Sequence, residues 1–194
     1  CVGIALVVES PAQARGTSEG EVRIAGCIRQ AAGGKPWLER TLWGLHDQEA
    51  GWLGAQVRNT NGSHDLGPLQ INSWWVPKIA AMVGRSQADV RTWLMLDACF
   101  NAGAARWIFL SALRTTGDFW KSVGIYHSPT AWRQRRYALS VARHMQRRFG
   151  RDIFAVPLMS ASAATPPARA AGASESTVSS VRVYGFGVVQ APPS

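Results

Sequence analysis

Glu49 is the residue whose sequence surroundings best suit acid catalysis. It lies at the end of an amphipathic segment, beside Trp43, Leu45 and Trp52, where a glycine-rich stretch begins. A carboxyl group among apolar side chains is partly desolvated, which raises its pKa and keeps it protonated near neutral pH. A protonated carboxyl can act as a general acid on a glycosidic oxygen. Taken alone, however, Glu49 fits better as a surface residue at a helix C-terminus than as a catalytic acid.

A segment rich in hydrogen-bonding side chains follows. It runs Asn59-Thr-Asn-Gly-Ser-His-Asp-Leu-Gly-Pro-Leu-Gln-Ile-Asn72. Its amide and carboxyl groups suit sugar hydroxyl and N-acetyl groups, and its glycines let the backbone lie close to a ligand. A polar surface turn explains the first half of the segment. It explains Gln70 and Asn72 poorly, because they lie within a few residues of Trp74 and Trp75.

Metal and nucleotide chemistry find no support in the sequence. The four His residues have no metal-ligand spacing with one another or with a Cys, and the glycine-rich stretches lack a P-loop or dinucleotide pattern. We therefore expect no metal and no cofactor.

Composition limits the class of protein and the class of partner. The 194 residues are enough for one domain with a core, and no apolar run approaches the roughly 20 residues of a transmembrane helix. The formal net charge of +9 favours a polyanionic partner, such as nucleic acid, an anionic membrane surface or a cell-wall polymer. The nine Trp residues suit stacking on sugars or on bases, so both partners stay open.

The first 14 residues resemble the remnant of an export signal. An apolar run, Val2-Gly-Ile-Ala-Leu-Val-Val8, precedes Ala12-Gln-Ala14, which has small residues where a signal peptidase reads. A buried N-terminal strand is the alternative. Export implies an oxidising compartment. Cys1, a weak candidate for lipid attachment, would leave with the signal, and Cys27 and Cys99 would then form a disulfide.

Residues 21–154 contain nearly all the Trp, Leu and Ile and predict one mainly helical domain. At most a short β-hairpin is expected, within residues 51–67. The predicted helices end at Gly33, run from Pro36 to Glu49, open at a Ser86 cap, run from Ala98 to near Gly117, and run from Ser128-Pro129 to Gly150. Residues 155–194 form a tail that is rich in Ala, Ser, Thr, Pro and Gly and is expected to be disordered, although residues 181–189 could dock as a strand.

Four segments in order resemble the lysozyme-like lytic transglycosylase (SLT) domain, in the small single-domain branch associated with conjugation, type IV and type III secretion and pilus systems. They are His46-Asp-Gln-Glu-Ala-Gly-Trp52, Asn61-Gly-Ser-His-Asp-Leu-Gly-Pro-Leu-Gln-Ile-Asn72, Cys99-Phe-Asn-Ala-Gly103 and Val123-Gly-Ile-Tyr-His-Ser128. The resemblance covers roughly residues 22–149 and implies a goose-type lysozyme-like fold. Three departures bear on substrate preference and rate: Ala50 replaces the usual Ser, Pro68-Leu69 the usual Leu-Met, and Tyr126-His-Ser-Pro129 the commoner Tyr-Asn-Ala-Gly.

The resemblance implies a peptidoglycan lytic transglycosylase with Glu49 as the catalytic acid and base. Such an enzyme needs one carboxyl, because the muramyl 6-hydroxyl attacks its own anomeric carbon. Asp65 is then expected to brace its loop by binding backbone N–H groups. We assign Gln70 and Asn72 to saccharide contacts. Tyr126 is expected to bond to Glu49 or to the substrate N-acetyl group, and Tyr137 to line the cleft.

The expected partner is peptidoglycan in the periplasm, with a secretion, conjugation or pilus machine as a second partner. A hydrolytic muramidase and a non-catalytic binding module are the alternatives. The predicted last helix carries no acidic residue among its seven arginines, Arg133, Arg135, Arg136, Arg143, Arg147, Arg148 and Arg151. These arginines fit a solvated face, attraction to anionic wall polymers, or DNA binding, and export argues against DNA.

Overall fold

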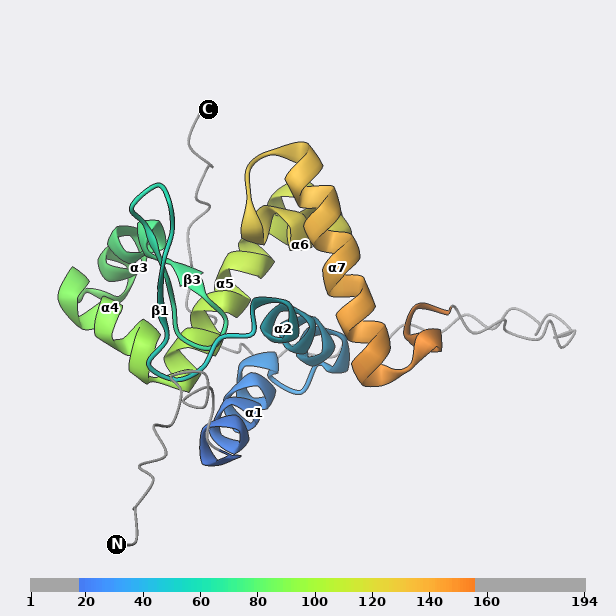
Figure 1. Cartoon of the computed structure of the whole chain (residues 1–194), viewed down its shortest axis with the longest axis horizontal. Helices are drawn as coiled ribbons and strands as arrows, with labels where there is room; N and C mark the ends of the chain where they lie inside the picture. The colour runs from blue at the N-terminus through green and yellow to red at the C-terminus, as the bar shows by residue number, and fades with distance from the viewer. Residues whose placement is uncertain (1–17, 156–194) are drawn as a thin grey trace, which may run out of the picture.

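The computed structural model describes residues 18–155, and the predictions for residues 1–14 and 156–194 lie outside this range. Within it the chain forms a mainly helical, lysozyme-like domain with one small sheet, the predicted fold class (Figure 1). The α-helices are α1 (Ser18–Ala32), α2 (Pro36–Glu49), α3 (Val76–Val83), α4 (Gln87–Leu96), α5 (Ala98–Thr116), α6 (Phe119–His127) and α7 (Ala131–Phe149). The antiparallel strands, in the order β1-β2-β3, are β1 (Gln56–Arg58), β2 (His64–Leu66) and β3 (Ile71–Asn72).

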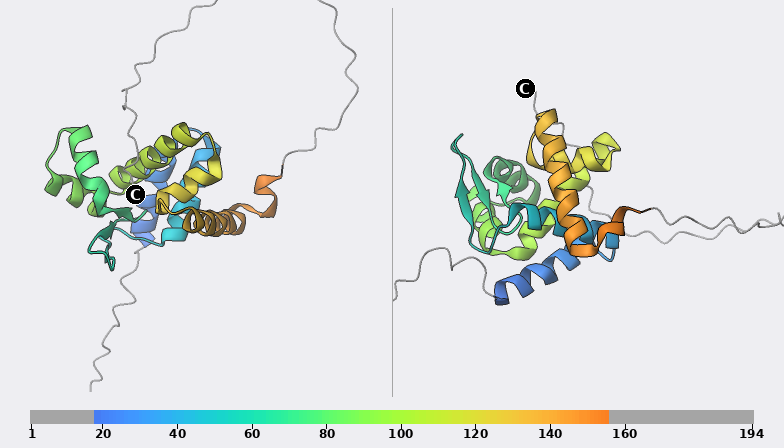
Figure 2. Two further views of the ribbon diagram at one scale, coloured as in Figure 1. Left: turned by 90° about the horizontal axis from the view of Figure 1, so that it is seen from above. Right: turned by 45° about the vertical axis from the view of Figure 1, so that its right-hand side comes forward.

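The core lies around α5, whose alanines let neighbouring helices approach closely. Ala102, Ala105 and Phe109 on α5 are at most 1% exposed and pack with fully buried leucines of α2. The sheet lies with α3 and α4 on one side of the domain, and α6 and α7 lie on the other (Figure 2). This arrangement leaves the end of α2, and therefore Glu49, between the two sides.

Local signals set the bounds of three helices as predicted. Pro36 opens α2, and the Ser86 side chain caps α4 by accepting from Asp89 N at 3.0 Å. Gly117 ends α5 in the left-handed conformation, with φ 65°. Ala50 ends α2 in the same conformation, with φ 49°, which is uncommon for a residue with a Cβ.

Three predictions made from the sequence, for α7, the sheet and Arg151, are wrong. The last helix begins at Ala131 rather than at Ser128, because Ser128 ends α6 and accepts from Thr130 N at 3.2 Å. A third strand, β3, pairs with β2 beyond the expected hairpin. Arg151 lies past α7 in a 3-10 turn (Arg151–Phe154), which Gly150 separates from the helix.

The arginines of α7 are not equivalent. Arg148 forms a two-pronged ion pair with Asp47 at 2.6 and 2.7 Å and lies 4.0 Å from the Trp43 ring centroid, so it ties α7 to α2. Tyr137, Val141 and Met145 face the core. The opposite, exposed face carries Arg135, Arg136, Arg143 and Arg147, none of which forms an ion pair with another residue in the 18–155 region.

Cys27 and Cys99 form a disulfide with a Cα–Cα distance of 4.5 Å. The bond joins α1 to the first turn of α5 across a sequence separation of 72 residues, as the cysteine count predicts. None of the helices in residues 18–155 has the length and hydropathy to span a bilayer.

Candidate active site

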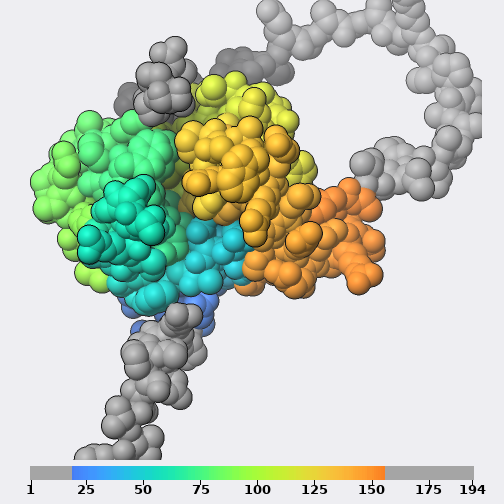
Figure 3. Space-filling view, turned by 45° about the horizontal axis from the view of Figure 1, so that its top comes forward, coloured from blue at the N-terminus to red at the C-terminus, as the bar shows by residue number. Residues whose placement is uncertain are grey.

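A cleft of about 370 Å³ separates the two sides of the domain, a volume within the range of small-molecule sites. In the space-filling view a recess lies between the teal and green surface of the sheet and α3–α4 and the gold surface of α6–α7 (Figure 3). Glu49, Asp65, Gln70, Asn72 and Tyr126, five of the residues selected from the sequence, line this cleft. Their convergence from α2, the sheet and α6 needs the tertiary fold, because the sequence separates them by up to 77 residues.

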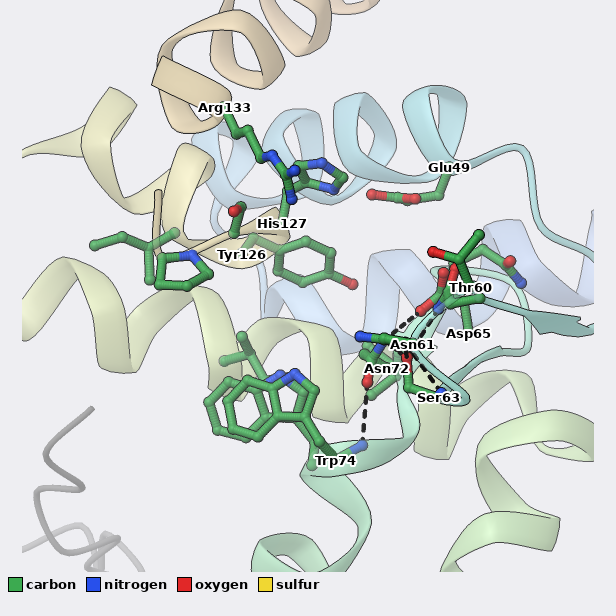
Figure 4. A pocket seen from close by; sticks show the side chains of 18 residues that line it. Glu49, Thr60, Asn61, Ser63, Asp65, Asn72, Trp74, Tyr126, His127 and Arg133 are labelled. Carbon is green, nitrogen blue, oxygen red and sulfur yellow. Dashed lines mark hydrogen bonds between the residues drawn. The ribbon is translucent and has the colours of Figure 1, made fainter. Parts of the chain in front are cut away.

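Glu49 reaches the cleft from the last position of α2, and its carboxylate faces the open space (Figure 4). Burial raises the pKa of Glu49 from 4.5 to about 7, a hydrogen bond from Tyr137 opposes the rise, and the charge of Asp65 adds to it. A substantial fraction of Glu49 therefore holds a proton at neutral pH. This is the state that a general acid needs.

The hydroxyl that binds Glu49 belongs to Tyr137, not to Tyr126. Tyr137, expected to line the cleft, is only 5% exposed and is not among the residues that line it. Its hydroxyl donates to Glu49 Oε1 at 2.5 Å. The expected Tyr126–Glu49 bond is absent from the structure: Tyr126 donates to the Leu69 carbonyl at 2.8 Å instead. Burial raises the pKa values of both tyrosines well above 10, so both stay neutral donors. α7 supplies the donor because its buried face packs on α2.

The side chains of Asp65 and Asn72 are hydrogen-bonded to each other. Asn72 Nδ2 donates to Asp65 Oδ1 at 2.8 Å and to Ser63 Oγ at 2.9 Å, while its Oδ1 accepts from Trp74 N at 3.1 Å. The carboxyl partner of Asp65 is thus a side-chain amide of the neighbouring strand, not the expected backbone N–H. The paired amide holds the Asp65 side chain at the cleft (Figure 4).

Gln70 lies in the bend between β2 and β3. Its Nε2 donates to the Gly67 carbonyl at 2.8 Å, and its φ of 49° is left-handed. A Cβ at Gly67, whose φ is 68°, would lie 2.0 Å from the Leu94 carbonyl oxygen, so the close approach requires glycine. Gln70 lines the cleft with its carbonyl group free to accept a hydrogen bond from a ligand.

Two buried side chains that the sequence analysis did not select fix this bend. Asn101 on α5 accepts from Leu69 N at 2.9 Å and donates to the Leu66 and Leu94 carbonyls, both at 2.8 Å. His46 Nδ1 lies 3.1 Å from the Pro68 carbonyl oxygen. Both residues lie within the quoted motif segments. A polar side chain at a helical position within a motif was the sequence feature that could have indicated their role.

Aromatic rings form the floor of the cleft. Trp74 and Trp75 stack with their centroids 4.1 Å apart, and Lys78 Nζ lies 5.0 and 5.1 Å from the two centroids. Trp74 is 48% exposed, so part of its ring is available to a ligand. An exposed indole beside amide groups suits the apolar face and the polar edge of a sugar.

The wall opposite the sheet carries His127 and Arg133 (Figure 4). The His127 ring stacks on Tyr137 at 4.6 Å with an interplanar angle of 2°. Burial lowers the pKa of His127, Asp65 opposes this and Arg133 adds to it. Among residues 18–155 no group of His, Cys, Asp and Glu could hold a metal ion.

The chain resembles a Salmonella invasion protein. Over 105 residues it is 30% identical to Invasion protein IagB of two Salmonella typhimurium strains and of Salmonella typhi. The matched region is 52% of this chain and 62% of IagB, so the chain spans less than two thirds of these curated relatives. No family model matches the sequence. The similarity to IagB therefore relates about half of this chain to a protein named for invasion.

Proposed function

We propose that this protein is a peptidoglycan lytic transglycosylase that cleaves the β-1,4 bond between N-acetylmuramic acid and N-acetylglucosamine. The observation that carries the proposal is Glu49, a carboxyl with a pKa of about 7 in a cleft lined by amides, hydroxyls and indoles. The four motif segments contribute residues to one site or to its support. Residues 21–154 would be the catalytic domain.

The reaction would use Glu49 twice. Its proton passes to the glycosidic oxygen as the bond from that oxygen to the anomeric carbon breaks. The 6-hydroxyl oxygen of the same muramyl sugar then bonds to the anomeric carbon, and its proton returns to Glu49. The products are a 1,6-anhydromuramyl end and a free 4-hydroxyl, and no water is consumed. The attacking group is already in the substrate, so its effective concentration is high.

Tyr137 would stabilise the Glu49 carboxylate between the two proton transfers. Its hydroxyl already donates to Glu49 Oε1 and so favours the charged form. Gln70 and Asn61 would bind substrate hydroxyl or N-acetyl groups from the sheet side, and Trp74 would stack on a sugar ring. Asn72 is engaged by Asp65 and Trp74, so its main role would be to hold the sheet side in place.

Hydrolysis by a muramidase is the second candidate, and Asp65 is the observation that favours it. Asp65 lines the same cleft and lies close enough to Glu49 to raise the pKa of Glu49. A second carboxylate could act as nucleophile or activate water. Its bond to Asn72 favours the transglycosylase, because it occupies one of the Asp65 oxygens.

The substrate would be reached in the periplasm after export, where the Cys27–Cys99 disulfide would persist. Local opening of the wall for a secretion or conjugation apparatus fits the similarity to an invasion protein. The exposed arginines of α7 would favour adsorption to the anionic wall.

Digestion of purified sacculi tests the proposal. We expect anhydromuropeptides by mass spectrometry, and borohydride-reducible ends would instead indicate hydrolysis. Glu49→Gln is expected to reduce product release by about two orders of magnitude or more, because the transferable proton is lost. Asp65→Asn should retain the anhydro product. Normal turnover by a folded Glu49→Gln protein would refute the mechanism.

A further inference from the structure

Arg133 brings a positive charge to the cleft from the first turn of α7. Its side chain reaches the cleft wall beside His127 (Figure 4). Its guanidinium carbon lies 5.3 Å from the Trp132 ring centroid, but no carboxylate in residues 18–155 forms an ion pair with it. Arg148 on the same helix differs, because both prongs of its guanidinium are engaged by Asp47. Arg133 is therefore available to an anionic ligand in the cleft.

The backbone that carries Arg133 is held firmly. Gln134 Nε2 donates to the Ser128 and Pro129 carbonyls at 3.0 and 3.1 Å. A Cβ at Gly124 would lie 2.6 Å from Gln134 Cβ, so α6 and α7 approach closely next to the cleft. A fixed backbone lowers the entropy cost of using a long side chain for recognition.

His127 supplies a neutral polar edge next to this charge. Its ring is held parallel to Tyr137, and its lowered pKa leaves it mainly uncharged at neutral pH. An uncharged imidazole has one N–H donor and one acceptor nitrogen. Arg133 is then the charged group of this wall, while Glu49 and Asp65 reach the cleft from α2 and the sheet.

We propose that Arg133, with His127 beside it, forms a subsite for a carboxylate carried by the lactyl substituent of the muramic sugar. This inference rests on the proposed function and adds a substrate preference to it. A guanidinium binds a carboxylate with two parallel hydrogen bonds, which gives both strength and orientation. Anchoring the substituent at α7 would turn the muramyl sugar towards Glu49 in one direction only.

The chemistry of wall glycans makes this preference selective. N-acetylglucosamine is neutral, whereas the lactyl group of muramic acid carries either a stem peptide with its own carboxylates or, after peptide removal, a free carboxylate. A chitin oligosaccharide has neither. The subsite therefore distinguishes wall strands from chitin, although both have β-1,4-linked N-acetyl sugars.

The test compares Arg133→Gln with Arg85→Gln, which removes the same charge outside the cleft. Three soluble ligands are used: peptide-bearing glycan fragments, amidase-treated fragments with free lactyl carboxylates, and chitotetraose. We expect Arg133→Gln to lower kcat/KM on at least one carboxylate-bearing fragment by about 10-fold, the scale of one charge-assisted interaction. Arg133→Lys should recover part of the loss. The fragment that loses more identifies the source of the carboxylate.

Affinity measured by calorimetry in a Glu49→Gln background separates binding from turnover. We expect Arg133→Gln to weaken binding of the carboxylate-bearing fragments by about 10-fold and to leave chitotetraose within about twofold. Equal weakening for all three ligands, or no weakening for either carboxylate-bearing fragment, would overturn the inference. If the wild-type protein releases no product, the proposed function is contradicted but the inference about Arg133 is not. The affinities of the three ligands would still decide the role of Arg133.

Discussion

Glu49→Gln is expected to increase the stability of the protein at alkaline pH, although it should greatly slow the proposed reaction. The pKa of Glu49 is about 7 in the folded chain against an ordinary value of 4.5. A group whose folded pKa is raised contributes stability that is fully present below its unfolded pKa and is lost as pH rises through its folded pKa. The wild-type protein should therefore lose stability from this group between about pH 4.5 and pH 7.5. Gln does not ionise, so the stability of the variant should not fall with pH for this reason.

The size of the effect follows from the two pKa values. Each pKa unit corresponds to about 1.4 kcal/mol, so a rise from 4.5 to about 7 corresponds to about 3 kcal/mol above pH 7.5. The cause is burial of the carboxylate, which outweighs the opposing hydrogen bond from Tyr137. The quantity to compare is the difference in unfolding free energy between Glu49→Gln and the wild type, taken at two pH values. The change of this difference with pH is independent of any constant effect of the substitution on packing.

Urea unfolding of both proteins at pH 5 and at pH 8 measures this difference. Because part of the loss has already occurred at pH 5, we expect the variant to gain about 2.5 kcal/mol on the wild type between the two pH values. Glu39→Gln is the control, because Glu39 lies on the same helix but outside the cleft, 4.0 Å from Arg29. Its stability difference should change by well under 1 kcal/mol. A Glu49→Gln difference that stays flat with pH, or falls, would refute the raised pKa and with it the general-acid role.

Three further predictions follow from the contacts. Tyr137→Phe should shift the alkaline midpoint of kcat/KM upward by about one pH unit, because it removes a bond to the Glu49 carboxylate, while Tyr126→Phe should not; a downward shift would contradict this. Replacing Cys27 and Cys99 by Ala should cost about 4 kcal/mol in urea unfolding, and two free thiols in unreduced protein would argue against the bond. The exposed arginines of α7 are Arg135, Arg136, Arg143 and Arg147, and replacing all four by Gln should lower adsorption to sacculi at low salt. Cleavage of short soluble fragments should stay unchanged. Tight binding to duplex DNA at physiological salt, without product release, would instead favour a nucleic-acid-binding module.

The parts of the fold that depend on local chemistry could be predicted from the sequence. Pro36 and Ser86 open helices and Gly117 closes one, because each acts on backbone groups within one turn. The Ser128-Pro129 pair misled the prediction for α7. Ser128 is taken up by the end of α6, and the helix starts at Ala131 instead. Two helices that meet in a short connection compete for the same capping residue, and local patterns do not resolve that competition.

The hydrogen-bond partners within the cleft could not be predicted, because they are tertiary. Tyr126 was expected near the site from its motif segment, and Tyr137 was expected there although it lies outside the four segments. Only the packing of α7 against α2 decides which of the two hydroxyls reaches Glu49. The same holds for Asp65, whose partner lies on β3, a two-residue strand too short to show alternation. A motif can thus predict which residue types lie near a site. Which donor pairs with which acceptor depends on the tertiary fold.

Asn101 shows how the scaffold and the reaction are connected. One amide side chain satisfies three backbone groups, at Leu66, Leu69 and Leu94, and so joins α5, the end of α4 and the bend before β3. That bend holds the Leu69 carbonyl that accepts from Tyr126 and the Gly67 carbonyl that accepts from Gln70. A buried amide with unpaired groups is costly, so the bend and the amide hold each other in place. Loss of Asn101 would therefore loosen the cleft wall facing Glu49 before it changed any group that touches the substrate.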